Sequence, residues 1–432
     1  MKHTVIGRVA VGAGAMALAI SACSTSSSTA ASSAGSTASA GSTASAGSAG
    51  TATSTPINLE YIGAVTGPPP LFTEELVGVK AAAMAINKAG GINHHPVNII
   101  TCDTKDTPSG ETTCAQGLAS SGAVAVVGEG TIFTTAVDDE TTKLQMANIG
   151  LSGGGSSDLA RTNTASFSLA VPGTAGLVCP SALADQGAAK IGVLGINASG
   201  VQLEVQAAQA GIKKIPGASY AGATLINFGD NDLAGPLQTA VSKGANGLVL
   251  GLTVDGAIAA LRANAGRVKM CTAASVFTPA DIKSLGSAAN GLIELASVPP
   301  LDLLPKSGPL GQEFVSDENA YYASTHDSSA NPAIINDLTT QGWMSVKAFQ
   351  QVASKLPNVT QQSVYAAFSH TTNLSFPGLL PASINYAKTQ PIPTLARLFV
   401  PEYSVYVWNA ANQTWTATGK SYNVVSFLSG QG

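Results

Sequence analysis

The sequence predicts an α/β protein made of two doubly wound parallel-sheet lobes. Strand-like and helix-like segments alternate from Ile57 onward, which is the pattern of repeated β-α-β units. Several strand-like runs, such as 123–128, are almost wholly apolar, as expected for parallel strands buried on both faces. Roughly 375 of the 432 residues follow position 56, which is too long a segment for one ordinary core. Two sheets, each covered by helices, are therefore expected.

Individual elements follow from periodicity and from end signals. Apolar and polar residues alternate over 57–65, which predicts the first strand, and the proline-rich turn at 66–70 ends it. Apolar residues at helical spacing over 76–86 predict a helix, and Thr107 with Pro108 predicts the start of another. Further strands are expected at 97–102, 123–128, 147–151, 190–195, 224–227, 247–252, 268–271, 291–296 and 403–408, and further helices at 201–212, 233–243 and 337–356.

The first 22 residues predict a secretory signal peptide. Lys2 and Arg8 precede an uncharged run from Val9 to Ile20, and small residues follow before Cys23. The apolar run is about a dozen residues long, whereas a helix that spans a bilayer needs about 20. The segment is therefore expected to be cleaved rather than to remain as a membrane span.

Residues 23–56 predict a lipidated tether. The run Ile20-Ser21-Ala22-Cys23 resembles the lipobox of bacterial lipoproteins, which implies lipid attachment at Cys23 and an anchor in the membrane; the alternative is an ordinary cleavage site followed by a free thiol. Every residue from Ser24 to Thr55 is Ser, Thr, Ala or Gly, a composition that cannot bury a core. A coil of this length spans about 30 Å, which suits a leash between a membrane and a folded body.

The charged, cysteine and histidine residues indicate which nucleic-acid, metal and cofactor partners to expect. The chain has 21 basic and 25 acidic residues and no cluster of Lys and Arg, so a nucleic-acid partner is not expected. No C-x-x-C spacing occurs, and His94-His95 stand in a turn-like run. Neither a metal site nor a cofactor is therefore expected.

Besides Cys23 the chain contains four cysteines. This even number suits disulfide formation in a protein that is exported into an oxidising compartment. We expect two bonds, Cys102–Cys114 and Cys179–Cys271.

Several short segments together resemble the leucine/isoleucine/valine-binding family of type I periplasmic binding proteins, here as a lipoprotein of the actinobacterial type. They occur in the family's order and spacing: Gly63-Ala64-Val65-Thr66-Gly67-Pro68, 85–92, Cys102-Asp103-Thr104, Val126-Val127-Gly128 and Val407-Trp408-Asn409-Ala410. The resemblance implies a protein that delivers a solute to an ABC permease, and a chain that crosses three times between its lobes. It places lobe 1 at 57–173 and 299–397 and lobe 2 at 174–298 and 398–432, and we expect a monomer.

The resemblance also implies where a solute would bind. Ligands of this family are held by hydroxyl groups and backbone N–H groups in loops after lobe 1 strands, and glycine allows such a close approach. The matching loops supply the lobe 1 candidates Phe72, Glu129, Thr131, Ile132, Phe133, Ser152, Gly153, Gly154 and Ser156. The lobe 2 candidates are Thr174, Ser199, Thr253 and Ser275. For most of these the alternative is an ordinary strand-to-helix turn, and for Phe72 it is a core phenylalanine.

The lobe 2 positions differ from the family in one respect. Amino-acid binders of the family neutralise the ammonium of their ligand with lobe 2 carboxylates, because a bare ammonium in a closed site is costly. The matched positions here are Thr174 and Ala273. The ligand is therefore expected to be an amide, a small organic acid or another small apolar or neutral solute; otherwise Glu129 supplies the charge for a branched-chain amino acid.

Two other functions fit parts of the sequence. Gly150-Leu151-Ser152-Gly153-Gly154 has the form G-x-S-x-G of a hydrolase nucleophile elbow, and a triad would pair Ser152 with a histidine and an acid downstream. The available residues are His326 or His370 and Asp302 or Asp337. The family resemblance explains this loop without catalysis, so no enzyme activity is expected. A tethered ligand sensor with the same fold is the second alternative.

Overall fold

A computed structural model describes residues 54–67, 71–150, 159–162, 164–169, 176–197, 199–227, 229–230, 232–273 and 277–430. The predicted signal peptide and nearly all of the predicted tether, including Cys23, lie outside these residues. Within them, no helix is both long enough and apolar enough to cross a bilayer.

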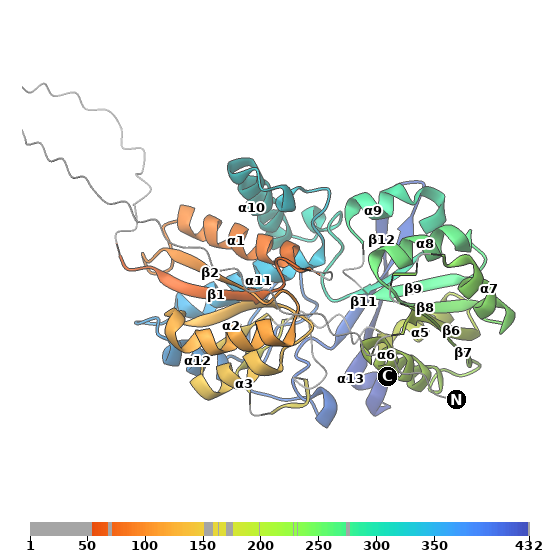
Figure 1. Cartoon of the computed structure of the whole chain (residues 1–432), viewed down its shortest axis with the longest axis horizontal. Helices are drawn as coiled ribbons and strands as arrows, with labels where there is room; N and C mark the ends of the chain where they lie inside the picture. Colours follow the sequence, from red (N-terminus) through yellow and green to blue (C-terminus); the bar gives the residue numbers. More distant parts are fainter. Residues whose placement is uncertain are drawn as a thin grey trace, which may run out of the picture. The chain divides into compact units, whose positions relative to one another are not determined.

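The first sheet contains five parallel strands in the order β2-β1-β3-β4-β5. Their bounds are β1 Ile57–Gly63, β2 Val97–Asp103, β3 Ala125–Gly130, β4 Ala147–Ile149 and β5 Ser166–Phe167. Side chains alternate between its two faces: Leu59 and Tyr61 belong to one buried cluster, and Ile62 belongs to another. Helices cover both faces (Figure 1): α1 Thr73–Lys88, α11 Asp337–Ala353 and α12 Gln361–Ser369 on one, and α2 Pro108–Ser121 and α3 Thr135–Leu144 on the other.

The second sheet has the order β12-β11-β10-β9-β8-β6-β7. Its strands are β6 Lys190–Ile196, β7 Ser219–Ile226, β8 Gly247–Gly251, β9 Lys269–Ala273, β10 Ile293–Ala296, β11 Glu402–Asn409 and β12 Thr414–Asn423. The surrounding helices are α5 Cys179–Asp185, α6 Ser199–Ile212, α7 Ala234–Ser242, α8 Val254–Asn264, α9 Pro279–Ser284 and α13 Val424–Ser429. Separate apolar clusters lie on the two faces, so this sheet is doubly wound as well.

The predicted fold class is confirmed, with one difference at an edge. The chain leaves the first sheet after β5, returns after β10 to form α10 (Pro309–Thr325), α11 and α12, and re-enters the second sheet at β11, which makes three crossings. The second sheet is not parallel throughout, because β11 pairs antiparallel with both β10 and β12. β11 and β12 form a hairpin, which needs only a short turn, whereas parallel neighbours need a crossover. The lobe boundaries at 173, 298 and 397 stay predictions.

Both predicted disulfides are present. Cys102 in β2 is bonded to Cys114 in α2, and Cys179 at the start of α5 is bonded to Cys271 in β9. The second bond lies inside an apolar cluster of the second sheet, where both cysteines are completely buried. Each bond therefore joins a helix to the sheet that it covers.

A buried glutamate in α10 should make the stability of the protein depend on pH. The side chain of Glu318 is 2% exposed, and both carboxyl oxygens lack a hydrogen-bond partner among the described residues. Burial, with a smaller contribution from the charge of Asp317, raises the pKa of Glu318 from 4.5 to about 8. The folded state therefore holds a proton that the unfolded state releases between these two pH values, so the free energy of unfolding falls as pH rises through that window.

We expect this fall to approach about 1.4 kcal/mol per pH unit for a single group. The substitution Glu318→Gln should remove most of the Glu318 contribution and raise the stability at pH 8 relative to the parent protein. Urea unfolding at pH 5, 6.5 and 8 measures both proteins. Equal slopes in the two proteins would show that Glu318 is not protonated in the folded state.

Candidate functional site

The strand order of the first sheet predicts a ligand-binding site at one edge of the sheet. β1 lies between β2 and β3, so the connection after β1 and the connection after β2 run in opposite directions along the sheet. Ligands of open α/β sheets bind at such a reversal, outside the carboxyl ends of the strands. Here the reversal brings the loop after β1 against the end of β3, and the N–H of Ala64 donates to the carbonyl of Gly130 at 2.7 Å.

The second sheet has the same kind of reversal at β6, which lies between β7 and β8. The loops at this edge begin at Asn197 and at Leu252. Ser199 is the first residue of α6, and the hydroxyl of Thr253 accepts the N–H of Gly256 at 3.3 Å as the N-cap of α8. Two of the predicted lobe 2 residues therefore lie at the edge that the topology selects.

Aspartate side chains hold the first-sheet loops in place. Asp103, at the end of β2, accepts the N–H groups of Val65 and Thr66 and the hydroxyl of Thr66, all from the loop after β1. Burial would raise the pKa of Asp103, but the hydrogen bonds from Thr66, Val65 and Lys105 together lower it below its ordinary value. The carboxylate is therefore ionised and fixes the shape of this loop.

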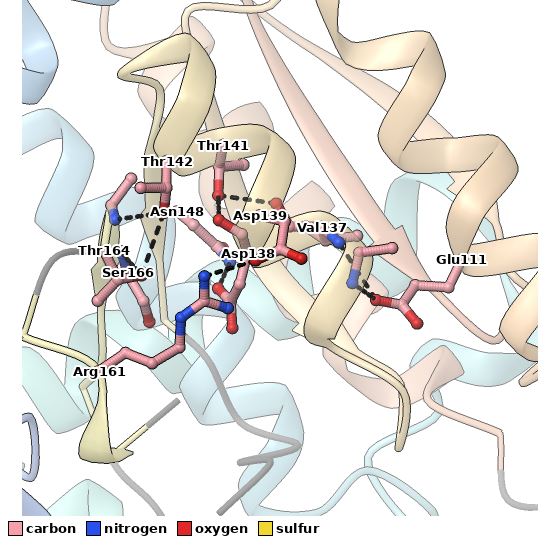
Figure 2. Close-up of polar contacts among 12 residues, drawn as sticks. Glu111, Val137, Asp138, Asp139, Thr141, Thr142, Asn148, Arg161, Thr164 and Ser166 are labelled. Carbon is pink, nitrogen blue, oxygen red and sulfur yellow. Dashed lines mark hydrogen bonds and ion pairs between the residues drawn. The ribbon is translucent and has the colours of Figure 1, made fainter. Parts of the chain in front are cut away.

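The loop after β3 is held in the same way. Asp106 accepts the N–H of Ile132 at 3.1 Å and the hydroxyl of Thr131 at 3.3 Å. Glu111 of α2 accepts the N–H groups of Ala136 and Val137 at 2.6 and 3.2 Å, and so caps the first turn of α3 (Figure 2). Two backbone N–H groups in the first turn of α3 are therefore already satisfied by a protein carboxylate.

This finding differs from the expectation that the loop after β3 offers unpaired N–H groups to a ligand. The N–H of Ile132 is taken by Asp106, and the N–H of Phe133 is taken by the hydroxyl of Thr131. Thr131 itself is completely buried, whereas Ile132 is 54% exposed and Phe133 and Phe72 are half-buried. The side chains that face outward at this edge are therefore mainly apolar.

Glu129 lies beneath the loop. Its side chain is completely buried and accepts the side-chain N–H of Asn148 in β4 at 2.6 Å, and the same amide group lies 3.4 Å from Asp138 of α3. Figure 2 shows Asn148 beside Asp138. The neighbouring Asp139 forms a different contact, an ion pair with Arg161. Glu129 therefore joins β3 to β4, and Asn148 extends the contact to α3.

The other predicted site residues lie outside the described residues. These are Ser152, Gly153, Gly154, Ser156, Thr174 and Ser275. The described ranges contain no group of three or more His, Cys, Asp or Glu side chains that is arranged to hold a metal ion.

Glu204 of α6 also lies at the second-sheet edge, although it was not among the predicted site residues. A methyl group added at Gly251, the last residue of β8, would lie 2.6 Å from a carboxyl oxygen of Glu204, and one added at Gly176 would lie 2.7 Å from its Cγ. The two glycines therefore make room for this side chain at the reversal. Burial raises the pKa of Glu204 from 4.5 to about 7, so the carboxyl is partly protonated at neutral pH.

Among the described residues, the histidines and aspartates of the hydrolase alternative do not contact one another. His326 is an exposed residue at the end of α10, and exposed His370 contacts the carbonyl of Ala366 at the end of α12. Neither histidine hydrogen-bonds to Asp302 or Asp337 in the part of the chain that the structure describes, and Ser152 lies outside it.

Removing the carboxylate of Asp106 should loosen the loop after β3. The substitution Asp106→Ala leaves the N–H of Ile132 and the hydroxyl of Thr131 without their acceptor, and we expect a loss of about 1–2 kcal/mol in local stability. Amide hydrogen exchange should accelerate at Ile132 and its neighbours. The variant Asp139→Ala, which loses an exposed ion pair with Arg161, is the control and should leave these amides unchanged.

Comparisons with known proteins agree with this architecture. A family model described as periplasmic binding protein matches residues 56–394. No curated protein matches the sequence significantly. Similar solved structures include a substrate-binding periplasmic protein from Ralstonia solanacearum, with 14% identity, a TM-score of 0.68 and coverage of 84% of this chain and 99% of that one.

Two further similar structures are described together with a ligand. A leucine binding protein from Thermotoga maritima has 14% identity and a TM-score of 0.63, with coverage of 85% of this chain and 99% of that one. An ABC transporter solute binding protein from R. palustris in complex with benzoate has 13% identity and a TM-score of 0.64, with coverage of 84% and 96%. At these identities the likeness shows a shared fold.

The family match covers most of the chain, and both sheets have the strand reversals at which α/β proteins bind ligands. Members of this family are extracytoplasmic proteins that bind small molecules and are generally not enzymes. The chain belongs to the periplasmic binding protein family.

Proposed function

We propose that this protein is the solute-binding subunit of an ABC importer and that it captures one small molecule between its two lobes. The observation that supports this most is the pair of strand reversals, one in each sheet, with predicted site residues beside both. A solute that contacts both edges would stabilise a closed arrangement over an open one, because only the closed form offers both sets of contacts.

The proposed ligand is a neutral or acidic solute with an apolar part, such as an amide or a small organic acid. Leu71 and Ile132, which follow β1 and β3, are exposed apolar side chains at the first-sheet edge. At the second-sheet edge the partly protonated Glu204 can donate a hydrogen bond to a ligand oxygen. The benzoate complex of the R. palustris protein shows that this fold accommodates an aromatic acid in at least one relative.

The protonation of Glu204 gives a test of this ligand class. If the carboxyl donates to a ligand oxygen, binding raises its pKa above about 7 and takes up a proton, so affinity falls as pH rises from 6 to 8. The variant Glu204→Gln keeps a donor at all pH values and should bind with little pH dependence. Calorimetry of the best ligand in buffers with different ionisation enthalpies measures the proton count. Release of a proton on binding would instead identify an ammonium ligand, such as an amino acid.

The membrane anchor is part of the proposal. Cleavage after residue 22 would leave Cys23 as the acylated first residue, and the segment 24–55 would connect it to the folded body beginning at Ile57. Expression with a labelled fatty acid tests this: the parent protein should carry the label in the membrane fraction. The variant Cys23→Ser should lose the label, and a labelled Cys23→Ser protein would contradict lipid attachment at this residue. We also propose that the protein is a monomer that docks on a membrane permease.

A further inference from the structure

The chain around β5 contributes to both apolar cores. Leu159 packs in a cluster of the second sheet, whereas Phe167 and Leu169 pack in the cluster of the first sheet. In the sequence, this part of the chain connects the predicted solute-binding loop 152–156 to the predicted site residue Thr174. Its position therefore affects both of these predicted parts of the solute site.

The last chain crossing contributes to both cores as well. All residues of 395–400 are buried. Leu395 and Leu398 pack in the cluster of the second sheet. The adjacent Phe399 and Val400 pack in the cluster of the first sheet. The chain therefore passes from one core to the other between two neighbouring residues.

Backbone hydrogen bonds of Arg397 fasten this crossing to the chain around β5. The N–H of Arg397 donates to the carbonyl of Leu159 at 2.9 Å, and its carbonyl accepts the hydroxyl of Ser168 at 3.0 Å. Leu159 belongs to the second-sheet core, while the two neighbours of Ser168 in the sequence belong to the first-sheet core. One residue is therefore bonded to chain that is anchored in each of the two cores.

The side chain of Arg397 strengthens this connection. The residue is only 7% exposed, and its guanidinium group donates to the carbonyl of Ser166 in β5. The guanidinium carbon lies over two aromatic rings, at 5.4 Å from the centre of Phe167 and 4.8 Å from the centre of Phe399. Such contacts are strong where water is excluded, so the side chain ties β5 to the last crossing.

We propose that Arg397 is a positioning residue for solute capture and that it limits how far the two lobes separate when no solute is bound. This inference rests on the proposed closure of the lobes around a solute. Further opening would have to break the contacts of Arg397 or pull Leu159 or Leu398 out of the second-sheet core. A restricted opening lowers the conformational cost that solute binding must offset.

Distances between two spin labels in the full, ligand-free chain test the proposal. The labels replace exposed residues, Gln116 of α2 and Arg262 of α8, and are attached to introduced ketone side chains so that the disulfides stay intact. The parent protein should give one narrow distance distribution. Arg397→Gln should raise the share of a second, shifted population at least about tenfold, because the contacts of the charged guanidinium group are lost. A distribution equal to that of the parent would overturn the proposal.

Tyr386→Phe is the matched control for a loss of bonding at β5. The hydroxyl of Tyr386 donates to the carbonyls of Phe167 and Ser168 at 3.2 and 3.1 Å, and its ring packs in the first-sheet core. The variant keeps every contact of Arg397 to the second-sheet core, so it should show the parent distribution. Equal broadening in Tyr386→Phe and Arg397→Gln would show that any loss of bonding around β5 frees the lobes, and the proposal would fail.

Ser168→Ala decides the question if Arg397→Gln does not fold. This variant removes only the hydroxyl that donates to the carbonyl of Arg397, and it should cause a smaller shift in the same direction. An unchanged distribution in Ser168→Ala would then count against the proposal. No solute is present in these measurements, so their outcome does not depend on whether the protein captures a solute.

Discussion

The substitution Gly342→Ala is expected to lower the free energy of unfolding by about 3 kcal/mol, which is large for one methyl group. Helices α1 and α11 cross at two glycines. A Cβ atom at Gly342 would lie 2.1 Å from the carbonyl oxygen of Glu75 in α1, and one at Gly78 would lie 1.9 Å from the carbonyl oxygen of Thr339 in α11. Because these contacts are with backbone, the helices themselves must separate, and the apolar cluster between them loses its packing.

Urea unfolding of the folded body measures this loss, and Gly117→Ala supplies the control. Gly117 is an exposed residue inside α2, where an added Cβ would contact nothing within 4 Å. Alanine at that position should raise stability by about 0.5–1 kcal/mol, since glycine is the poorer helix former. If Gly342→Ala and Gly117→Ala changed stability in the same direction, the close crossing of α1 and α11 would be wrong.

Loss of the Cys179–Cys271 bond should have a still larger effect, about 4–5 kcal/mol in the loop-entropy account, because its cysteines are 92 residues apart. The matched comparison is Cys102–Cys114, which closes a loop of 12 residues and should contribute about 3 kcal/mol. Each pair is replaced by alanine, so that no thiol is left to form a wrong bond.

The structure predicts that removing Cys179–Cys271 lowers the free energy of unfolding more than removing Cys102–Cys114 does. The urea midpoints of the two double variants measure this order. The Cys179–Cys271 bond also crosses an apolar cluster, so its removal leaves a gap in the core of the second sheet. A larger loss for the Cys102–Cys114 variant would contradict the placement of these bonds.

Much of the fold could be predicted from the sequence because its strands are short apolar runs between turn signals. The start of α2 follows directly from chemistry, since Thr107 accepts the N–H of Gly110 and Pro108 is the first helical residue. β12 escaped prediction because most of its positions are exposed and polar. α10 has a glutamate, Glu318, at one of its four buried positions, so its apolar periodicity is broken in the sequence.

The site could be predicted only in part. Its loops follow from the ends of strands, but the groups that satisfy them come from other elements: Asp106 and Glu111 precede the loop after β3 by about 25 residues. A pattern of residue types cannot show that these carboxylates accept the backbone N–H groups of the loop. Glu204 was missed for a related reason, since it looks like an ordinary polar residue of an amphipathic helix until Gly176 and Gly251 are seen to make space for it.

Solute capture at both strand reversals is tested most directly by a crystal structure of the folded body with the best ligand from a thermal-shift screen of amides, amino acids and aromatic acids. We expect one solute in contact with the loops after β1 or β3 and also with Glu204 or the loops after β6 or β8. A solute that bound tightly while touching only one sheet would contradict capture at both reversals.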